Sequence, residues 1–486
     1  MNVEIGFLAL QRFGFGARPG DLAKIAADPR GSLKAELAKP DVALIALDAP
    51  GNADLMGSTA ALQGHFAAEA QRKLMRDALA APSAAMPAPA PALGGGAMEG
   101  AAKLNSQSVP RSDEPRFEIN TFHAEARAKA QKILDADAGF VERLVHFWSN
   151  HFSVSVTKSP IIRTAVGAFE REAIRPHVLG SFADMLIAVT RHPVMLTYLD
   201  NQQSVGPNSK AGKNRSRGLN ENLGREILEL HTLGVDTGYG QADVVALANM
   251  ITGWTMAGQG GQLGEPGAFV FNANAHEPGA QSLLGKTYPA GGLGQGEAAL
   301  ADLARHPATA RHIAFKLARH FVADEPPPAL VARLAANFTA HDGDLRALAL
   351  ALIDAPETWE APLTKLRSPF EFVLAMRRAT LRQPLTVARP ILGPLSALGQ
   401  LLWQPPGPNG FPDTAAAWAS PEGVKLRLDV ADNISRQIKD IDNPSDLLRE
   451  IIGEAASEET RQAVARAASR AEGIALVFLS PEFQRR

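Results

Sequence analysis

Cysteine is absent from the 486 residues of this sequence. The chain therefore has no disulfide bond, no thiolate nucleophile and no zinc–thiolate or iron–sulfur site. Aromatic residues make up only 6% and the net charge is −2, so the composition points neither to nucleic acid nor to a membrane surface. No apolar run approaches the ~18 residues of a membrane-spanning helix.

Several functional motifs are missing as well. Residues 1–7 lack the basic region and apolar run of a secretory signal, so we expect a cytoplasmic protein. The alternative is a periplasmic protein, exported together with a signal-bearing partner. No phosphate-binding loop or dinucleotide fingerprint lies between a predicted strand and helix, so no nucleotide cofactor is expected. No Ser-His-Asp order, nucleophile elbow or zinc-protease helix is present, which leaves the reaction type open.

The residues that are present favour helix. Alanine and leucine are abundant and 45% of the chain is hydrophobic, which predicts a mainly α, bundle-like protein with many helices. One small β-hairpin is expected from residues 268–271 and 282–288. Length alone allows roughly three domains. We expect residues 1–80 to pack with residues 117–486 as one unit, joined by an Ala/Pro/Gly-rich and polar loop or linker over 81–116.

The most unusual polar pattern lies in residues 218–254. Apolar spacing predicts a helix over Asn220–His231, ended by Gly234. Glu226 and Glu229 are three residues apart in this otherwise apolar helix, so at least one is expected to point inward. A buried carboxylate must be paired or bound to a metal, because burying a lone charge costs several kcal/mol or more.

A second group of polar residues lies in the helix predicted from residue 140 onward. His146 and Asn150 are four apart and share a helix face, whereas His151 is turned by about 100° from Asn150. Trp148 adds an apolar wall. Two imidazoles in this setting could bind a metal or transfer a proton. Alternatively, both histidines cap or bridge helices through hydrogen bonds to the backbone.

Two further segments carry basic side chains. The polar residues 203–217 include Lys213 and Arg215, which either bind an anionic group or belong to a solvated loop. In the helix predicted over Thr309–Val322, the side chains at positions 312, 316 and 320 (His, Lys and His) lie at steps of four on one face.

Several motifs resemble the bacterial family DUF1800. They are residues 147–152 (FWSNHF), 220–235, 238–239 with 243–244, and 252–254 (TGW), followed by 284–286 (LGK), 316–317 with 321–322, and 408–412 (PNGFP). The resemblance covers nearly the whole chain, and the family is named for having no assigned function. It implies exported proteins that are often encoded beside a second uncharacterised family, DUF1501, whose members resemble sulfatases and alkaline phosphatases.

Our first hypothesis is a metal-dependent enzyme of unknown reaction, with a site where residues 146–151 meet the helix at 220–231. Without thiols, imidazole and carboxylate ligands suit zinc, manganese or iron. The predicted metal ligands are His146, His151, Glu226 and His231. The predicted catalytic residues are Glu226, Glu229, His231 and Arg225. The predicted substrate-binding residues are Asn150, Asn222, Trp148, Lys213 and Arg215.

Our second hypothesis is a non-catalytic helical partner or chaperone of an exported, sulfatase-like protein of the DUF1501 type. In that case the same polar residues form ion pairs and helix caps, for example between Arg225 and Glu229. With either hypothesis, the basic loop could recruit an anionic glycan or small molecule. Neither hypothesis includes a nucleic-acid partner or a membrane span.

Overall fold

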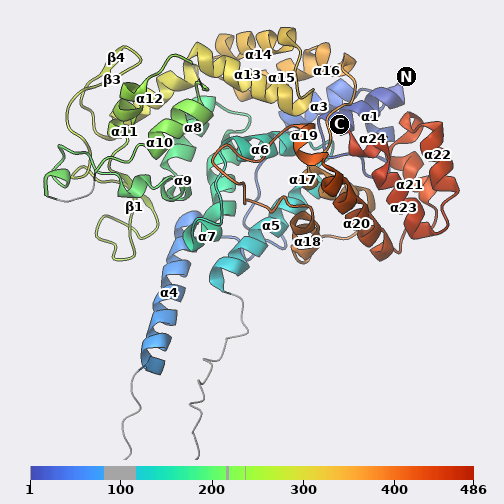
Figure 1. Cartoon of the computed structure of the whole chain (residues 1–486), viewed down its shortest axis with the longest axis horizontal. Coiled ribbons are helices and arrows are strands. Elements are labelled where there is room, and N and C mark those ends of the chain that lie inside the picture. The colour runs from blue at the N-terminus through green and yellow to red at the C-terminus, as the bar shows by residue number, and fades with distance from the viewer. Residues whose placement is uncertain (1, 81–115, 215–217, 236) are drawn as a thin grey trace, which may run out of the picture.

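The computed structural model describes residues 2–80, 116–214, 218–235 and 237–486, and helices dominate it (Figure 1). The predicted mainly α fold is confirmed. The predicted linker lies outside the described residues, apart from residue 116. Arg215 lies outside them as well. Within the described part of the chain, no helix is both long and apolar enough to cross a lipid bilayer.

The first half of the chain supplies the centre of the molecule. Its helices are α1 (Asn2–Arg12), α2 (Asp21–Ile25), α3 (Pro29–Ala38), α4 (Ser58–Ala80), α5 (Phe117–Asp135), α6 (Phe140–His151), α7 (Pro160–Phe169), η1 (Glu170–Ile174), η2 (Arg175–His177), α8 (Phe182–Arg191), α9 (Pro193–Tyr198), η3 (Asn201–Gln203), η4 (Gly212–Asn214), α10 (Asn222–Glu226), η5 (Ile227–His231) and α11 (Gln241–Met250). In Figure 1, α6 lies in the middle of the body, whereas α4 and α5 extend away from it.

The second half surrounds this centre with further helices. They are α12 (Leu293–Arg305), α13 (Pro307–Phe321), α14 (Pro328–Ala340), α15 (Leu345–Asp354), α16 (Glu357–Glu360), α17 (Pro369–Thr380), α18 (Arg389–Ala397), α19 (Ala415–Trp418), α20 (Pro421–Gln437), α21 (Pro444–Ile451), η6 (Gly453–Ala455), α22 (Glu458–Ala465), α23 (Arg470–Leu479) and α24 (Pro481–Gln484). Figure 1 shows α13–α16 along one side and α20–α24 at one end. One hydrophobic cluster includes residues from α1 through α24, so residues 1–80 and 117–486 contribute to a common core.

The strands pair differently from the prediction. β1 (Trp254–Met256) pairs with β2 (Phe269–Phe271), and β3 (Gln281–Leu283) pairs with β4 (Lys286–Tyr288), both antiparallel. The predicted pairing of 268–271 with 282–288 is therefore wrong. Leu284 and Gly285 have φ angles of 50° and 77°, the left-handed values that a tight two-residue hairpin turn requires. Residues 282–288 therefore fold back on themselves.

The helix predicted over Asn220–His231 is interrupted by a change of geometry. It is α-helical over Asn222–Glu226 and becomes a π-helical turn over Ile227–His231. Gly234 ends it as predicted, with φ of 90° and its N–H donating to the carbonyl of Leu228 at 3.2 Å. A π-helical turn contains an extra residue and occurs frequently at functional sites.

Candidate functional site

The π-helical turn leaves two backbone carbonyls that accept hydrogen bonds from imidazoles of other helices. His151 at the end of α6 places Nε2 3.1 Å from the carbonyl of His231, and His312 on α13 places Nε2 3.2 Å from that of Leu230. A carbonyl oxygen can only accept, so both imidazoles carry their proton on Nε2. For His151, this is the backbone-bridging role that the sequence left as an alternative.

A lysine completes this group. Lys316 Nζ donates to Nδ1 of His151 at 2.9 Å, which is possible because Nδ1 is the unprotonated nitrogen of that ring. The rings of His231 and His312 each lie 6.2 Å from the ring of His151. These four residues, His151, His231, His312 and Lys316, form what we call the imidazole–lysine cluster. The side chains of His151 and His231 are buried, and Nδ1 of His231 has no hydrogen-bond partner among the described residues.

Burial controls protonation in the imidazole–lysine cluster. It lowers the pKa of Lys316 from 10.5 to about 8, that of His231 to about 3 and that of His312 to about 4. It also holds the pKa of His151 well below its ordinary value, and in all three imidazoles the charge of Lys316 adds to the effect. At neutral pH the imidazoles are neutral, and Lys316 is the member of the cluster that changes charge near pH 8.

No carboxylate among the described residues forms an ion pair with Lys316. Asp413 raises its pKa only through space, against the larger effect of burial. Instead, the Asp413 carboxylate accepts from His320 Nδ1 at 2.8 Å. Arg143 Nη2 lies 3.3 Å from Nε2 of the same ring. Lys316 therefore keeps an uncompensated charge in a partly buried position.

A group of buried ion pairs lies beside the cluster along α6 and α13. Glu371 contacts Arg143 at 3.1 Å and Arg486 at 2.8 Å, and Arg486 also donates to the carbonyl of His320 on α13. All three charged side chains are at most 1% exposed. We call Glu371, Arg143 and Arg486 the arginine–glutamate group. It joins α6, α13 and α17 through charge-assisted hydrogen bonds.

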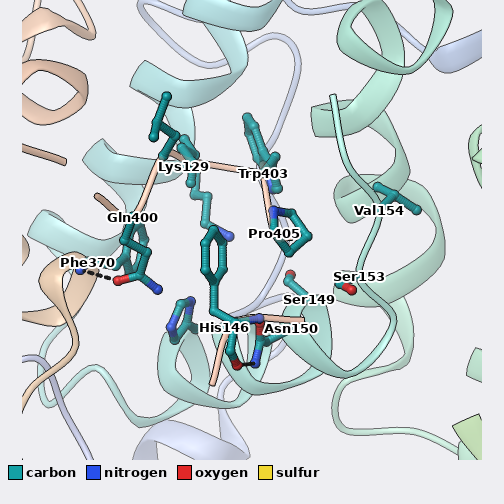
Figure 2. A pocket seen from close by; sticks show the side chains of 13 residues that line it. Lys129, His146, Ser149, Asn150, Ser153, Val154, Phe370, Gln400, Trp403 and Pro405 are labelled. Carbon is teal, nitrogen blue, oxygen red and sulfur yellow. Dashed lines mark hydrogen bonds between the residues drawn. The ribbon is translucent and has the colours of Figure 1, made fainter. Parts of the chain in front are cut away.

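A small cavity lies on another side of α6 (Figure 2). It has a volume of about 40 Å³ and is lined by residues of α5, α6 and α17 and by residues 153–154, 400–403, 405 and 411. His146 lines it with its ring stacked on Phe370, at 4.5 Å between ring centroids and 12° between the ring planes. Figure 2 shows the Lys129 side chain reaching into the same space. Burial lowers the pKa of His146 well below its ordinary value, so its ring is neutral at pH 7.

Asn150 holds one wall of the cavity in place. Its amide donates to the carbonyl of Phe411 at 2.9 Å and accepts from the N–H of Phe411 at 2.8 Å, so one side chain satisfies both backbone groups of that residue. The preceding Gly410 has φ of 80°, and a Cβ atom there would lie 2.5 Å from the backbone oxygen of Asn150. The motif 408–412 is thus explained by close packing on α6.

Gly234, which follows the π-helical turn, packs closely against the imidazole–lysine cluster. Gly234 has φ of 90°, and a Cβ atom there would lie 2.8 Å from Nδ1 of His312. Gly238 has φ of 96° with nothing within 4 Å of such an atom. We expect Gly238→Ala to cost about 1–2 kcal/mol through backbone strain alone, and Gly234→Ala to cost at least about 1 kcal/mol more, because it also displaces His312.

Urea unfolding of the two variants measures this difference, and Gly238→Ala is the matched control for backbone strain. Equal losses of unfolding free energy in the two variants would show that the close approach of residue 234 to the His312 ring adds nothing to the cost of the substitution.

The remaining predicted site residues lie elsewhere. Arg225 is partly exposed and pairs with Glu221 at 3.1 Å and with Glu229 at 3.7 Å. Glu226 is partly buried, and burial followed by the charge of Glu229 raises its pKa. Trp148 is buried against His151 and Phe152, Asn222 begins α10, and Lys213 is exposed in η4.

The predicted metal ligands do not form one coordination site. His151 and His231 meet in the imidazole–lysine cluster, whereas His146 lines the cavity and Glu226 lies on α10, before the π-helical turn. Across the described parts of the chain, no three histidine, aspartate or glutamate side chains are grouped so that they could hold a metal ion.

Comparisons with known proteins identify a family and nothing closer. The family model described as "Protein of unknown function (DUF1800)" matches residues 8–485, nearly the whole chain. No curated protein and no solved structure matches significantly.

Proposed function

The chain belongs to the DUF1800 family, whose description names no function, and we propose from the site itself that it is an enzyme transferring a proton to or from an anionic substrate at Lys316. The observation that carries this proposal is the hydrogen bond between Lys316 Nζ and His151 Nδ1, made by a lysine that has no ion-pair partner in the described structure.

A lysine in this position is costly for the fold. Taking an ammonium group out of water without a carboxylate partner costs several kcal/mol, and an apolar side chain of similar volume would be more stable there. Perturbed ionisable groups of this kind concentrate at functional sites. A pKa of about 8 leaves Lys316 divided between its charged and neutral forms near physiological pH, which suits a general acid or base.

The histidines have separate roles in this proposal. His151 is a positioning residue, because its Nε2 is held on the carbonyl of His231 and its Nδ1 holds the Lys316 amino group. His312 fixes the π-helical turn from the other side through the carbonyl of Leu230. The imidazoles are neutral, so the Lys316 ammonium gives the cluster a net positive charge. This charge favours the binding of an anionic substrate.

Competitive labelling with acetic anhydride tests the central claim, because only the neutral amine reacts. We expect Lys316 to reach half of its maximal reactivity near pH 8, about two units below ordinary lysines. The exposed lysines in the same peptide digest, measured by mass spectrometry, serve as the internal reference. Half-maximal reactivity at or above pH 10 would contradict the proposal.

Activity of variants gives an independent test. Lys316→Met and Lys316→Arg are both expected to lose at least about 100-fold in any activity found by screening small carboxylate, phosphate and sulfate compounds, because arginine keeps the charge but cannot give up its proton. Lys425→Met, at an exposed position on α20, is the matched control. If the folded Lys316→Met protein keeps full activity, the non-catalytic role as a partner protein is favoured instead.

A further inference from the structure

The cavity beside His146 is separate from the imidazole–lysine cluster. His146 and His151 are five positions apart on α6, which places them about 140° apart around the helix axis. The cavity is formed by α5, α6, α17 and the segment before α19, whereas the cluster is formed by α6, η5 and α13. A ligand in the cavity would not occupy the position proposed for the substrate at Lys316.

The charges next to the cavity are already balanced. Lys129 donates to Glu170, and Arg175 contacts both Glu170, at 3.0 Å, and Glu142, at 2.9 Å. Two cations therefore face two carboxylates, all of them buried. A charged ligand would add an uncompensated charge in this buried setting, and such a charge carries a large desolvation penalty. The cavity therefore favours an uncharged ligand.

The hydrogen-bonding groups around the cavity are mostly donors. The side-chain oxygen Oε1 of Gln400 accepts a hydrogen bond from the N–H of Phe370 at 2.8 Å, which leaves the amide hydrogens of Gln400 available to a ligand. His146 makes no hydrogen bond among the described residues, so its ring N–H is also available. Lys129 also lines the cavity, and its Nζ lies 5.5 Å from the ring centroid of Trp403 and 5.7 Å from that of Phe370.

The hydroxyl and amide groups at the rim are already engaged. Ser149 donates to Glu170 at 2.9 Å, Ser153 donates to the carbonyl of Pro408 at 2.9 Å, and Asn150 is paired with Phe411. The rest of the lining is apolar or aromatic, including Trp403 and Pro405 (Figure 2). The volume of about 40 Å³ corresponds to about three water molecules, so the ligand has only a few non-hydrogen atoms.

We propose that this cavity is a binding site for a small uncharged molecule with a carbonyl oxygen, such as a short amide or ketone. The oxygen accepts from Gln400 and His146, and the methyl groups contact the aromatic wall formed by Phe370 and Trp403. Recognition by a few polar groups in an otherwise apolar cavity is the common arrangement of small-molecule sites.

Ligand-observed NMR with acetamide as the probe tests this proposal on the full chain. We expect saturation transfer to the acetamide methyl group with a Kd on the order of millimolar, as fits a ligand of four non-hydrogen atoms. Acetate and methylammonium, of similar size but charged, are expected to bind at least tenfold more weakly. Acetate binding as tightly as acetamide would overturn the proposal.

A substitution at His146 tests whether acetamide binds in the cavity. His146→Phe keeps a ring stacked on Phe370 and removes both ring nitrogens, so acetamide binding is expected to weaken at least fivefold. His341→Phe, at an exposed position after α14, is the matched control and is expected to bind acetamide unchanged. Equal binding by the two variants would overturn the proposal. The acetamide results do not depend on Lys316, and the labelling of Lys316 is measured without acetamide. The two proposals can therefore fail independently.

Discussion

Replacing Glu371 by glutamine is expected to lower the free energy of unfolding by about 3–5 kcal/mol, because it breaks a buried ion pair from one side. The carboxylate lies 3.1 Å from Arg143 and 2.8 Å from Arg486. Its loss leaves the buried Arg143 without a paired carboxylate and leaves Arg486 with only Asp413, at 3.3 Å. Burial alone would raise the pKa of Glu371, but Arg143 and Arg486 outweigh this effect and hold that pKa well below its usual value.

Urea unfolding at pH 7 measures this loss, and Glu360→Gln, an exposed glutamate on α16, is the control with an expected change within about 0.5 kcal/mol. The depressed pKa has a consequence with a definite sign. The stability that Glu371 contributes is present above its unfolded pKa of 4.5 and is lost as pH falls below that value. A loss at pH 7 below about 1 kcal/mol would show that the arginine–glutamate group is not a major source of stability.

Acidification from pH 6.5 to 5 is expected to destabilise the protein through its buried histidines. Burial lowers the pKa of His231 to about 3 and those of His312 and His320 to about 4, and it holds those of His146 and His151 well below 6.5. Between pH 6.5 and these values each of the five histidines is protonated in the unfolded chain and neutral in the folded chain. Each such histidine therefore removes about 1.4 kcal/mol of stability per pH unit as the pH falls.

The stability curve against pH, from urea unfolding at half-unit steps, measures this slope. His312→Gln keeps an amide donor for the carbonyl of Leu230 but cannot titrate, so it is expected to flatten the slope by about one proton. His341→Gln, at an exposed histidine, is the matched control. The contribution of carboxylates with depressed pKa values begins only below about pH 4.5, the unfolded value of Glu170, whose folded pKa Lys129 and Arg175 lower to about 2 against the effect of burial. Stability that is constant from pH 7 to pH 5 would contradict the prediction.

Local patterns were enough to predict the helical fold and the face of α13 that carries His312, Lys316 and His320. Those patterns could not show which residues lie opposite that face. Lys316 contacts a histidine 165 positions away, and Arg143 contacts a glutamate on α17. Such pairs are set by packing between distant helices, and no spacing within one helix reveals them.

The expected site at Glu226 and Glu229 differs from the structure for a local reason. Helical periodicity was extended over the whole segment Asn220–His231, but the π-helical turn adds a residue and rotates the later side chains relative to an α-helix. Glu229 is partly exposed and pairs with Arg225, while His231 turns inward. The lining residues Lys129 and Gln400 gave no signal, because they come from segments outside the polar motifs of the sequence.

The equal steps of four between the basic residues of α13 leave its register on α6 ambiguous. A slide of one turn, about 5.4 Å, would present His312 or His320 to His151 instead of Lys316. Imidazoles can form a similar hydrogen bond, so this contact alone selects no single alignment. Arg143 and Arg486 settle the choice, because both meet the same carboxylate and Arg486 also holds the carbonyl of His320. The arginine–glutamate group thus fixes the alignment of α13 on α6 and keeps the Lys316 amino group opposite His151.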